Sequence, residues 1–399
     1  MLSLFSGAGG LDFGFEAAGF RTAGALELDA DCCRTLRQNR AWPVLEGDIG
    51  RTSAEYLLGY ARLAPGEVDV LVGGPPCQPF SKSGYWASGD AKRLEDPRAK
   101  TLQGYLRMLE HLLPGVFLLE NVRGISYSGK NEGLTYLQEQ IEGINRRTGA
   151  RYAPSWRVLK ATDFGVPQSR ERFFMVAQRD GAEFAWPEPT HRDPELEGTL
   201  SPYRTAWDAL GDLEPPSADL SVAGKWGPLL PSIPEGHCYD WHTERRGGLP
   251  LFGWRRHYFN FLRKLAKDRP SWTLQAQPGP AIGPFHWHSR RLSPRELARI
   301  QTFPDDVEIS GTLREVQRQL GNAVPSLLAE VLARHIRTQL LGLPALEGPP
   351  SLLPPDRGPP PPPEPVAEVP ERFLDRLGSH AAHPGTGKGY GALRRASTG

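Results

Sequence analysis

Short runs of apolar residues alternate with stretches of helical periodicity over about the first 180 residues. Apolar runs of roughly 4–8 residues, bounded by turn-forming residues, are typical of strands that are buried on both faces of a sheet. The predicted strands span residues 2–5, 23–28, 68–72, 116–122 and 173–177. Because helical segments separate these strands, the pattern predicts a parallel or mixed α/β sheet.

The alternation ends near residue 185, and the chain becomes rich in Pro, Gly, Trp and Arg. This composition predicts a smaller, loop-rich domain inserted into the first. Helices then return: Ser293, Pro294 and Glu296 predict a capped helix to about residue 302, and Pro325 opens another to about residue 341. The predicted organisation is a first domain over 1–184, a second domain over 185–290, helices that return to the first over 291–341, and a disordered proline-rich tail over 342–399.

The composition is that of an ordinary soluble protein, with 399 residues, 23% of them charged, and a net charge of +1. That net charge by itself neither favours nor excludes nucleic acid as a partner. The four cysteines form no Cys-x-x-Cys pair, and no apolar run is long enough for a signal peptide or a membrane span. We therefore expect a cytoplasmic protein without disulfides, metal or membrane anchor, in which Cys32 and Cys33 are packing residues.

A glycine-rich turn follows the first predicted strand, and a helix then runs from about residue 11 to Gly19. This strand, turn and helix form the unit that binds nucleotide-type cofactors, where glycines such as Gly7 and Gly9 let the ligand lie against the backbone. A dinucleotide fingerprint would need glycine at position 12, where this chain has Asp12. The sequence therefore favours a smaller ligand without phosphates.

Acidic residues lie at the end of the predicted strand 23–28 and after a further short strand expected just before residue 47. Glu27 is placed to accept hydrogen bonds from two ribose hydroxyls, and Asp48 with Ile49 to contact an adenine amino group and one ring face. A single carboxylate at a strand end is more often a surface residue. The order of glycine turn, Glu27, Asp48 and then a presented cysteine instead indicates S-adenosylmethionine.

Residues 73–81 read GGPPCQPFS and directly follow a predicted buried strand. Glycines allow close backbone approach and prolines fix φ, so the turn holds the thiol of Cys77 on a stiff support. An average cysteine in such a turn is merely buried. A presented nucleophile is the alternative, and it needs neighbours that favour the thiolate or take up charge as the sulfur attacks.

Charged residues lie at the ends of the neighbouring predicted strands. Glu120 emerges at the carboxyl edge of its strand, in the same crevice as Cys77. Arg170 and Arg172 precede the strand at 173–177, and alternation puts them on one side. This set suits addition of a thiol to an electron-poor ring carbon, with the carboxyl group on the adjacent ring nitrogen and arginine on a carbonyl oxygen.

In order along the chain, these segments resemble the motifs of DNA (cytosine-5)-methyltransferases. The matching stretches are FSGAGG from Phe5, ELD at 27–29, GDI at 47–49, GGPPCQPFS at 73–81, ENV at 120–122, QSRER at 168–172, RRLSPRELARIQTFP at 290–304 and GNAVP at 321–325. The resemblance covers residues 1 to about 341, apart from 185–260. It implies a Rossmann-like, S-adenosylmethionine-dependent methyltransferase fold, a mixed sheet with helices on both faces, and a smaller loop-rich target-recognition domain.

The resemblance also implies roles for single residues. Cys77 attacks cytosine C6, Glu120 engages N3, and Arg172 contacts the base near O2 with Arg170 supporting the site. C5 takes the methyl group of S-adenosyl-L-methionine, which leaves S-adenosyl-L-homocysteine; the C5 proton is then lost and Cys77 is eliminated. No residue identifies itself as the base for that proton. The predicted cofactor contacts are Phe5, Gly7, Gly9, Glu27, Asp48, Ile49, Leu102 and Asn322.

Basic and aromatic residues interleave between residues 241 and 291. Such a stretch fits phosphate contacts and base stacking, although a solvated basic face with a few core aromatics has the same composition. We favour double-stranded DNA as the partner, because a ring carbon inside a duplex is unreachable unless its base is flipped out. Residues 81–98 are predicted to form a mobile loop that closes over the flipped cytosine. The predicted DNA contacts are Ser81, Arg245, Arg246, Arg255 and Arg256.

The leading hypothesis is a monomeric bacterial methyltransferase of the restriction–modification type, whose cognate endonuclease, where one exists, is a separate chain. A tRNA-modifying member of the same family is the nearest alternative, but the Cys-Phe-Thr tripeptide of that subgroup is absent here. A catalytically idle DNA-binding regulator is the second alternative. The joint presence of Cys77, Glu120 and Arg172 argues against it.

Overall fold

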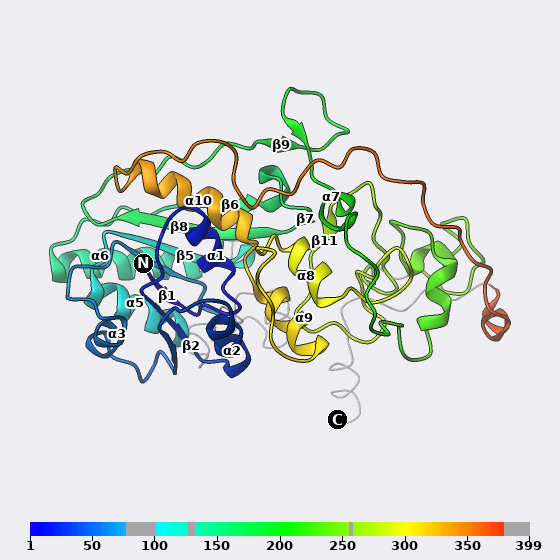
Figure 1. The fold of residues 1–399 in the computed structure, drawn as a ribbon, viewed down its shortest axis with the longest axis horizontal. Coiled ribbons are helices and arrows are strands. Elements are labelled where there is room, and N and C mark those ends of the chain that lie inside the picture. The colour runs from blue at the N-terminus through cyan, green and yellow to red at the C-terminus, as the bar shows by residue number, and fades with distance from the viewer. Residues whose placement is uncertain (77–99, 127–131, 255–257, 379–399) are drawn as a thin grey trace.

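A computed structural model describes residues 1–76, 100–126, 132–254 and 258–378 (Figure 1). Seven strands form one sheet in the order β3-β2-β1-β4-β5-β8-β6. Strands β1 to β5 run parallel, whereas β8 runs antiparallel to both β5 and β6. The bounds are β1 Leu2–Leu4, β2 Gly24–Glu27, β3 Val44–Glu46, β4 Val70–Gly73, β5 Val116–Val122, β6 Ser155–Lys160 and β8 Glu171–Gln178. The predicted mixed α/β sheet is confirmed.

Helices cover both faces of this sheet, as the sequence predicts (Figure 1). One face carries α3 (Ala54–Ala61), α5 (Lys100–Leu112) and α6 (Glu132–Thr148), and the other carries α1 (Gly10–Ala17) and α10 (Ser326–Gln339). Helices α1 and α10 pack closely because Gly14 has no side chain. A Cβ atom at that position would lie 2.4 Å from the Ala329 Cβ and the Ser326 carbonyl oxygen. No described helix has the length and apolar character that crossing a membrane requires.

The strand order reverses at β1, because β2 and β3 lie on one side of it and β4 and β5 on the other. In open α/β sheets a crevice forms at the carboxyl ends of the strands beside such a switch point. Helix α2 (Ala30–Asn39) begins at this edge directly after β2. Short 3-10 helices follow β5 and β6, namely η3 (Arg123–Ser126) and η4 (Ala161–Phe164). The fold therefore brings the ends of five consecutive parallel strands to one crevice.

Every element in the described residues of 185–290 (185–254 and 258–290) is short. These elements are β9 (His191–Arg192), β10 (Ser201–Pro202), α7 (Ala206–Leu210), η5 (Gly227–Ser232), η6 (Tyr239–His242) and β11 (Ser271–Trp272). Strand β11 pairs with β7 (Gln168–Ser169), just before β8, and so joins this region to the sheet. Its small core includes Leu229, Leu230, Ile233, Leu262 and Phe285.

Three longer helices follow, α8 (Pro294–Ile300), α9 (Leu313–Asn322) and α10. Ser293 and Glu296 form the predicted capping box at the start of α8. The sequence predicts that residues 291–341 return to the first domain, but among these helices α10 alone packs on the face of the sheet. Helices α8 and α9 instead share a core with α7 and with residues of the second region such as Leu274 and Trp287. The two parts of the molecule are therefore joined through common packing.

Residues 342–378 cross both parts of the molecule, as the orange-to-red segment of Figure 1 shows. Leu352 and Leu353 pack on the core beside α10, the buried Lys267 lies 2.9 Å from Glu364, and Phe373 in η7 (Glu371–Arg376) is buried in the second core. The predicted disorder is wrong for these residues. Proline-rich chain makes no internal hydrogen bonds, and its order here comes from contacts with distant residues that the local composition does not show.

Phe373→Ala is expected to loosen this segment, because the ring is 2% exposed and stacks on Trp226 at a centroid distance of 5.8 Å. Removing a buried phenylalanine costs about 3 kcal/mol. Limited proteolysis and urea unfolding measure the effect as faster cleavage after residue 341 and a lower unfolding midpoint. The matched control is Leu374→Ala, whose side chain is 39% exposed. Equal cleavage of the two variants contradicts a fixed segment.

Candidate active site

A cavity of about 740 Å³ opens at the carboxyl edge of the sheet. The loops after β1 to β5 supply most of its lining, and the end of α9 closes one side. The lining includes Phe5, Glu27, Leu28, Asp48, Ile49, Pro75, Pro76, Thr101, Glu120, Arg172 and Asn322. Motifs that lie far apart in the sequence therefore meet in one place.

Glu27, at the end of β2, is held by three backbone N–H groups. Gly7 donates to Oε2 at 2.7 Å, and Leu28 and Asp29 donate to Oε1 at 2.8 and 2.7 Å. Burial raises the pKa of this carboxyl group, although the three hydrogen bonds oppose that shift. Gly7 adopts a φ of +55°, and its N–H group donates to Glu27. That N–H group orients the carboxylate and is therefore not available to bind a phosphate.

Four more of the predicted cofactor residues, Phe5, Asp48, Ile49 and Asn322, line the cavity. Gly7 and Gly9 do not line it: Gly7 donates to Glu27 instead, and Gly9, with a φ of +90°, forms the turn that starts α1. Leu102 also does not, because it is 3% exposed and packs in the core beneath the sheet. The preceding residue, Thr101, lines the cavity in its place.

The cavity combines apolar surface from Phe5, Leu28 and Ile49 with the carboxylates of Glu27 and Asp48. A nucleoside presents ribose hydroxyls as donors and a ring that packs on apolar side chains, and a sulfonium group favours nearby carboxylates. The donor set therefore fits S-adenosylmethionine better than a phosphorylated cofactor.

Glu120 and Arg172 face each other at the other end of the cavity. The Arg172 Nε atom lies 2.8 Å from Glu120 Oε1 across the β5–β8 pair, and both side chains are largely buried. Burial raises the pKa of Glu120, and the neighbouring guanidinium groups of Arg172 and Arg170 only partly oppose this. The pair thus offers a carboxyl group able to hold a proton beside a fixed cation.

The loop that leads to Cys77 is anchored beside this pair. Asn121 donates from Nδ2 to the Pro75 carbonyl at 3.0 Å, and Thr101 donates from Oγ1 to the Pro76 carbonyl at 3.0 Å. A Cβ atom at Gly74 would lie 2.7 Å from Glu120 Oε2, so glycine permits the loop to pass over the carboxylate. Cys77 itself lies outside the described residues, as does Ser81.

Arg170 is fully buried and does not line the cavity. Its guanidinium group donates to the carbonyls of Gly321 at 2.7 Å and Leu274 at 3.3 Å, and to Gln168 Oε1 at 3.4 Å. The prediction of one catalytic side for both arginines is therefore wrong for Arg170. The chain leaves β7 and enters β8 at this point, so strand alternation does not extend across it.

Residues 1–338 match the family of C-5 cytosine-specific DNA methylases. The chain belongs to this family. It is 40% identical to the Type II methyltransferase M.SacI of Streptomyces achromogenes over 85% of this chain and 93% of that protein. It is 34% identical to M.NgoFVII of Neisseria gonorrhoeae over 84% and 86%. The predicted resemblance is confirmed, and with it DNA (cytosine-5)-methyl transfer from S-adenosylmethionine.

The fold of this methyltransferase is also similar to solved structures. A DNMT2 variant from Spodoptera frugiperda superposes with a TM-score of 0.57 at 16% identity, covering 84% of this chain and 98% of that one. At this identity the likeness concerns the fold alone. It agrees with the mixed sheet and helical layers of the methyltransferase.

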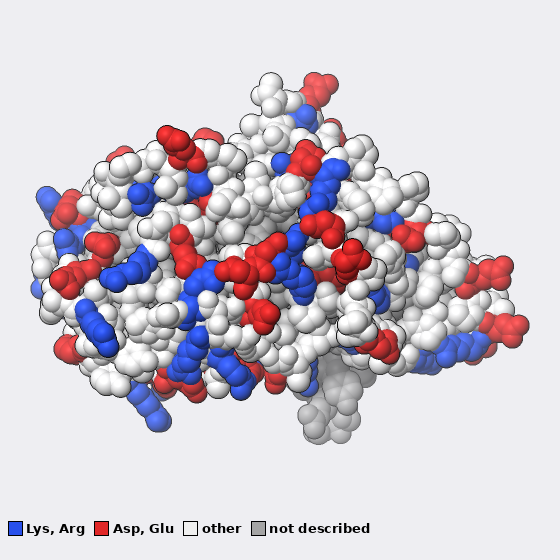
Figure 2. All heavy atoms as spheres, viewed as in Figure 1, with Lys and Arg blue, Asp and Glu red and all other residues white. Residues whose placement is uncertain are grey.

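Two of the predicted DNA contacts of the methyltransferase, Arg245 and Arg246, fall within the described residues, and neither lines the cavity. Arg245 and Arg246 are exposed; the Arg245 guanidinium lies 3.8 Å from the Trp254 ring centroid, and Arg246 lies 3.3 Å from Asp240. Arg255 and Arg256 lie outside the described residues. On the face that Figure 2 shows, basic and acidic side chains are intermingled.

Acidic partners from outside residues 241–291 neutralise part of the predicted basic stretch. Lys267 pairs with Glu235 and Glu364, and Arg290 pairs with Glu296. The aromatic residues are largely core, since Phe252, Phe261, Phe285 and Trp287 pack inside the second region. Tyr258 and Phe259 remain 48% and 40% exposed. Most of these rings therefore serve packing and are not available for base stacking.

Besides Thr101, the lining residues Asn121 and Leu28 were not predicted from the sequence. Asn121 is part of the ENV stretch, and its place directly after Glu120 was a usable signal for a residue that supports the cysteine loop. Leu28 is 67% exposed despite its apolar side chain and lines the cavity beside Glu27. Its place between two acidic residues offered a weaker signal.

Proposed function

We propose that this methyltransferase modifies C5 of one cytosine within a short, specific sequence of double-stranded DNA and protects that sequence in a restriction–modification system. The observation that supports this most is the convergence of Glu120, Arg172 and the anchored Pro75–Pro76 loop at one end of the cavity. Two Type II methyltransferases among its relatives support the restriction–modification context. The enzyme acts as a monomer, with the endonuclease as a separate chain.

The reaction starts at Cys77, whose thiolate adds to cytosine C6. Electron density then moves through the ring toward C5 while protonated Glu120 donates to N3 and Arg172 stabilises the charge near O2. When bound, S-adenosylmethionine supplies the methyl group that C5 receives. A water molecule takes the C5 proton, the electron pair of that bond returns to the ring, N3 gives its proton back to Glu120, and the C6–S bond breaks to release the Cys77 thiolate.

The ion pair between Arg172 and Glu120 supports this division of roles. The pair holds the carboxyl group at a fixed place when no base is present, and burial raises the Glu120 pKa toward the range in which a carboxyl group can donate a proton. The cytosine must leave the duplex to reach this depth. Ser81, Arg245, Arg246, Arg255 and Arg256 contact the DNA in this proposal.

Bisulfite sequencing tests the proposal directly. Genomic DNA is taken from a host without cytosine methylation, with and without expression of this chain. We expect protected cytosines at one short recurring sequence only when the chain is expressed. Absence of protection, with a soluble protein that binds S-adenosylmethionine, contradicts the DNA target and favours tRNA or an idle regulator.

A further inference from the structure

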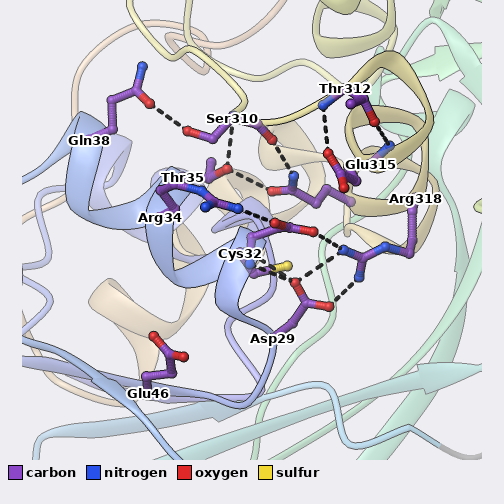
Figure 3. Close-up of polar contacts among 12 residues, drawn as sticks. Asp29, Cys32, Arg34, Thr35, Gln38, Glu46, Ser310, Thr312, Glu315 and Arg318 are labelled. Carbon is purple, nitrogen blue, oxygen red and sulfur yellow. Dashed lines mark hydrogen bonds and ion pairs between the residues drawn. The ribbon is translucent and has the colours of Figure 1, made fainter.

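Arg318 on α9 reaches across to the start of α2 and contacts two carboxylates there (Figure 3). Its Nη2 atom lies 3.2 Å from Asp29 Oδ1 and 2.7 Å from Asp31 Oδ2, and Nη1 also contacts Asp29. The Arg318 and Asp29 side chains are only 25% and 32% exposed. A forked, partly buried contact of this kind is more rigid than an isolated surface ion pair.

Asp29 connects this contact to the cavity. Its carboxylate caps α2 by accepting from the N–H groups of Asp31 and Cys32, and its own N–H group donates to Glu27 Oε1 at 2.7 Å. Glu27 to Ala30 all line the cavity. Arg318 therefore contacts Asp29, and Asp29 in turn contacts Glu27, the carboxylate that lines the cavity.

Helix α9 supplies the facing wall, because Asn322 lies one turn after Arg318 and lines the cavity. The other side of α9 is fixed on the body of the protein. Gln317 donates to the Gln275 carbonyl at 2.7 Å, and Gly321 accepts from buried Arg170 at 2.7 Å. Helix α9 is thus a firm support, and the β2–α2 turn is the part that Arg318 holds against it.

A second set of contacts also joins α2 to α9 and to Ser310 (Figure 3), and its residues do not line the cavity. Thr35 donates to buried Gln319 at 2.7 Å and accepts from the Ser310 N–H group at 3.1 Å. These contacts keep α2 and α9 associated without Arg318. Loss of the guanidinium group should therefore free the turn at residues 27–30 while the helices stay packed.

We propose that Arg318 is a positioning residue for S-adenosylmethionine, which it serves by clamping Asp29 and Asp31 so that Glu27 and Asn322 face each other at a fixed separation. The inference rests on the proposed placement of the cofactor in this cavity. Arg318 touches neither the cofactor nor the base in this proposal, and it acts through Asp29.

Arg318→Gln tests the clamp. We expect the KM for S-adenosylmethionine and the Kd for S-adenosylhomocysteine to rise about tenfold, which corresponds to about 1.4 kcal/mol, while kcat at saturating cofactor falls no more than about threefold. Arg318→Lys keeps the charge without the fork and should recover part of the affinity. Arg314→Gln is the matched control, since it removes an exposed arginine from the same helix.

Asp29→Asn completes a double-mutant cycle, because asparagine keeps the helix cap and removes the charge. We expect the Asp29→Asn and Arg318→Gln double variant to bind S-adenosylhomocysteine no more weakly than Arg318→Gln alone. Additive losses overturn the clamp, as does a Kd in Arg318→Gln equal to that of Arg314→Gln. Circular dichroism and thermal unfolding separate a lost fold from lost positioning.

Glu27→Gln separates failure of the clamp from failure of the cofactor placement. Weaker binding of S-adenosylhomocysteine by Glu27→Gln with no change in Arg318→Gln overturns only the role of Arg318. Unchanged binding in both variants overturns the placement of the cofactor on which the inference rests.

Discussion

Glu120→Gln is expected to lower kcat for methyl transfer by roughly 10²–10⁴-fold, the usual loss when a positioned acid is removed. Glutamine keeps the shape of the side chain and can still donate a hydrogen bond toward N3, but it cannot transfer a proton. It also leaves the partly buried Arg172 without its carboxylate at 2.8 Å. Single-turnover transfer of a radiolabelled methyl group to DNA measures the loss.

The pH profile gives an independent check on the same residue. Burial raises the Glu120 pKa, so the protonated form persists to higher pH than for an ordinary glutamate and declines as pH rises through the folded value. We expect an alkaline decline in kcat/KM for the parent enzyme that Glu120→Gln lacks. Parent-like activity in Glu120→Gln, or an unchanged pH profile, contradicts the proposed role.

Cys77→Ala serves as the reference for this comparison, because it removes the proposed nucleophile and should abolish transfer. DNA carrying 5-fluorocytosine cannot lose a proton from C5, so the parent enzyme should remain covalently attached to it. Glu120→Gln should form this adduct slowly and Cys77→Ala should not form it. An adduct in Cys77→Ala contradicts the proposed nucleophile.

The site was predictable from the sequence where it depends on strand ends. Glu27, Asp48 and Glu120 each end or follow a buried run, and parallel strands bring their carboxyl ends to one edge regardless of the loops between them. The sheet itself was predictable from the apolar runs, because the five predicted runs correspond to β1, β2, β4, β5 and β8. Local pattern and global topology agree at these positions.

The residues whose positions the sequence did not predict are placed by packing between distant segments. Arg170 turns inward because the carbonyls of Leu274 and Gly321 lie where a guanidinium group can reach them. Those acceptors come from 104 and 151 residues away in the sequence, beyond any local pattern. Leu102 and Thr101 are neighbours on α5, and only the helix rotation decides which one faces the cavity. The order of residues 342–378 likewise depends on a distant core that receives Phe373.

Asp12→Asn is expected to stabilise the protein, increasingly so as the pH rises from about 4 to 7. Asp12 is fully buried beneath the glycine turn, and within the described residues neither carboxyl oxygen has a hydrogen-bond partner. Desolvation raises its pKa to about 7, and nearby Ser3 and the Met1 ammonium group offset this only in part. Asp12, which replaces the glycine of a dinucleotide-binding turn, is therefore also a residue whose ionised form the fold disfavours.

The direction of this pH dependence follows from proton binding at Asp12. Between the unfolded pKa of about 3.9 and the folded value of about 7, the native protein holds one more proton at Asp12 than the unfolded chain does. Its stability then falls by about 1.4 kcal/mol per pH unit from this group, or roughly 4 kcal/mol in total. Asparagine carries no such proton, so urea unfolding at pH 5, 6, 7 and 8 should show an advantage that grows to pH 7 and is constant above it. The exposed Asp375→Asn control should show no such trend, and an Asp12→Asn advantage independent of pH contradicts a buried, protonated carboxyl group.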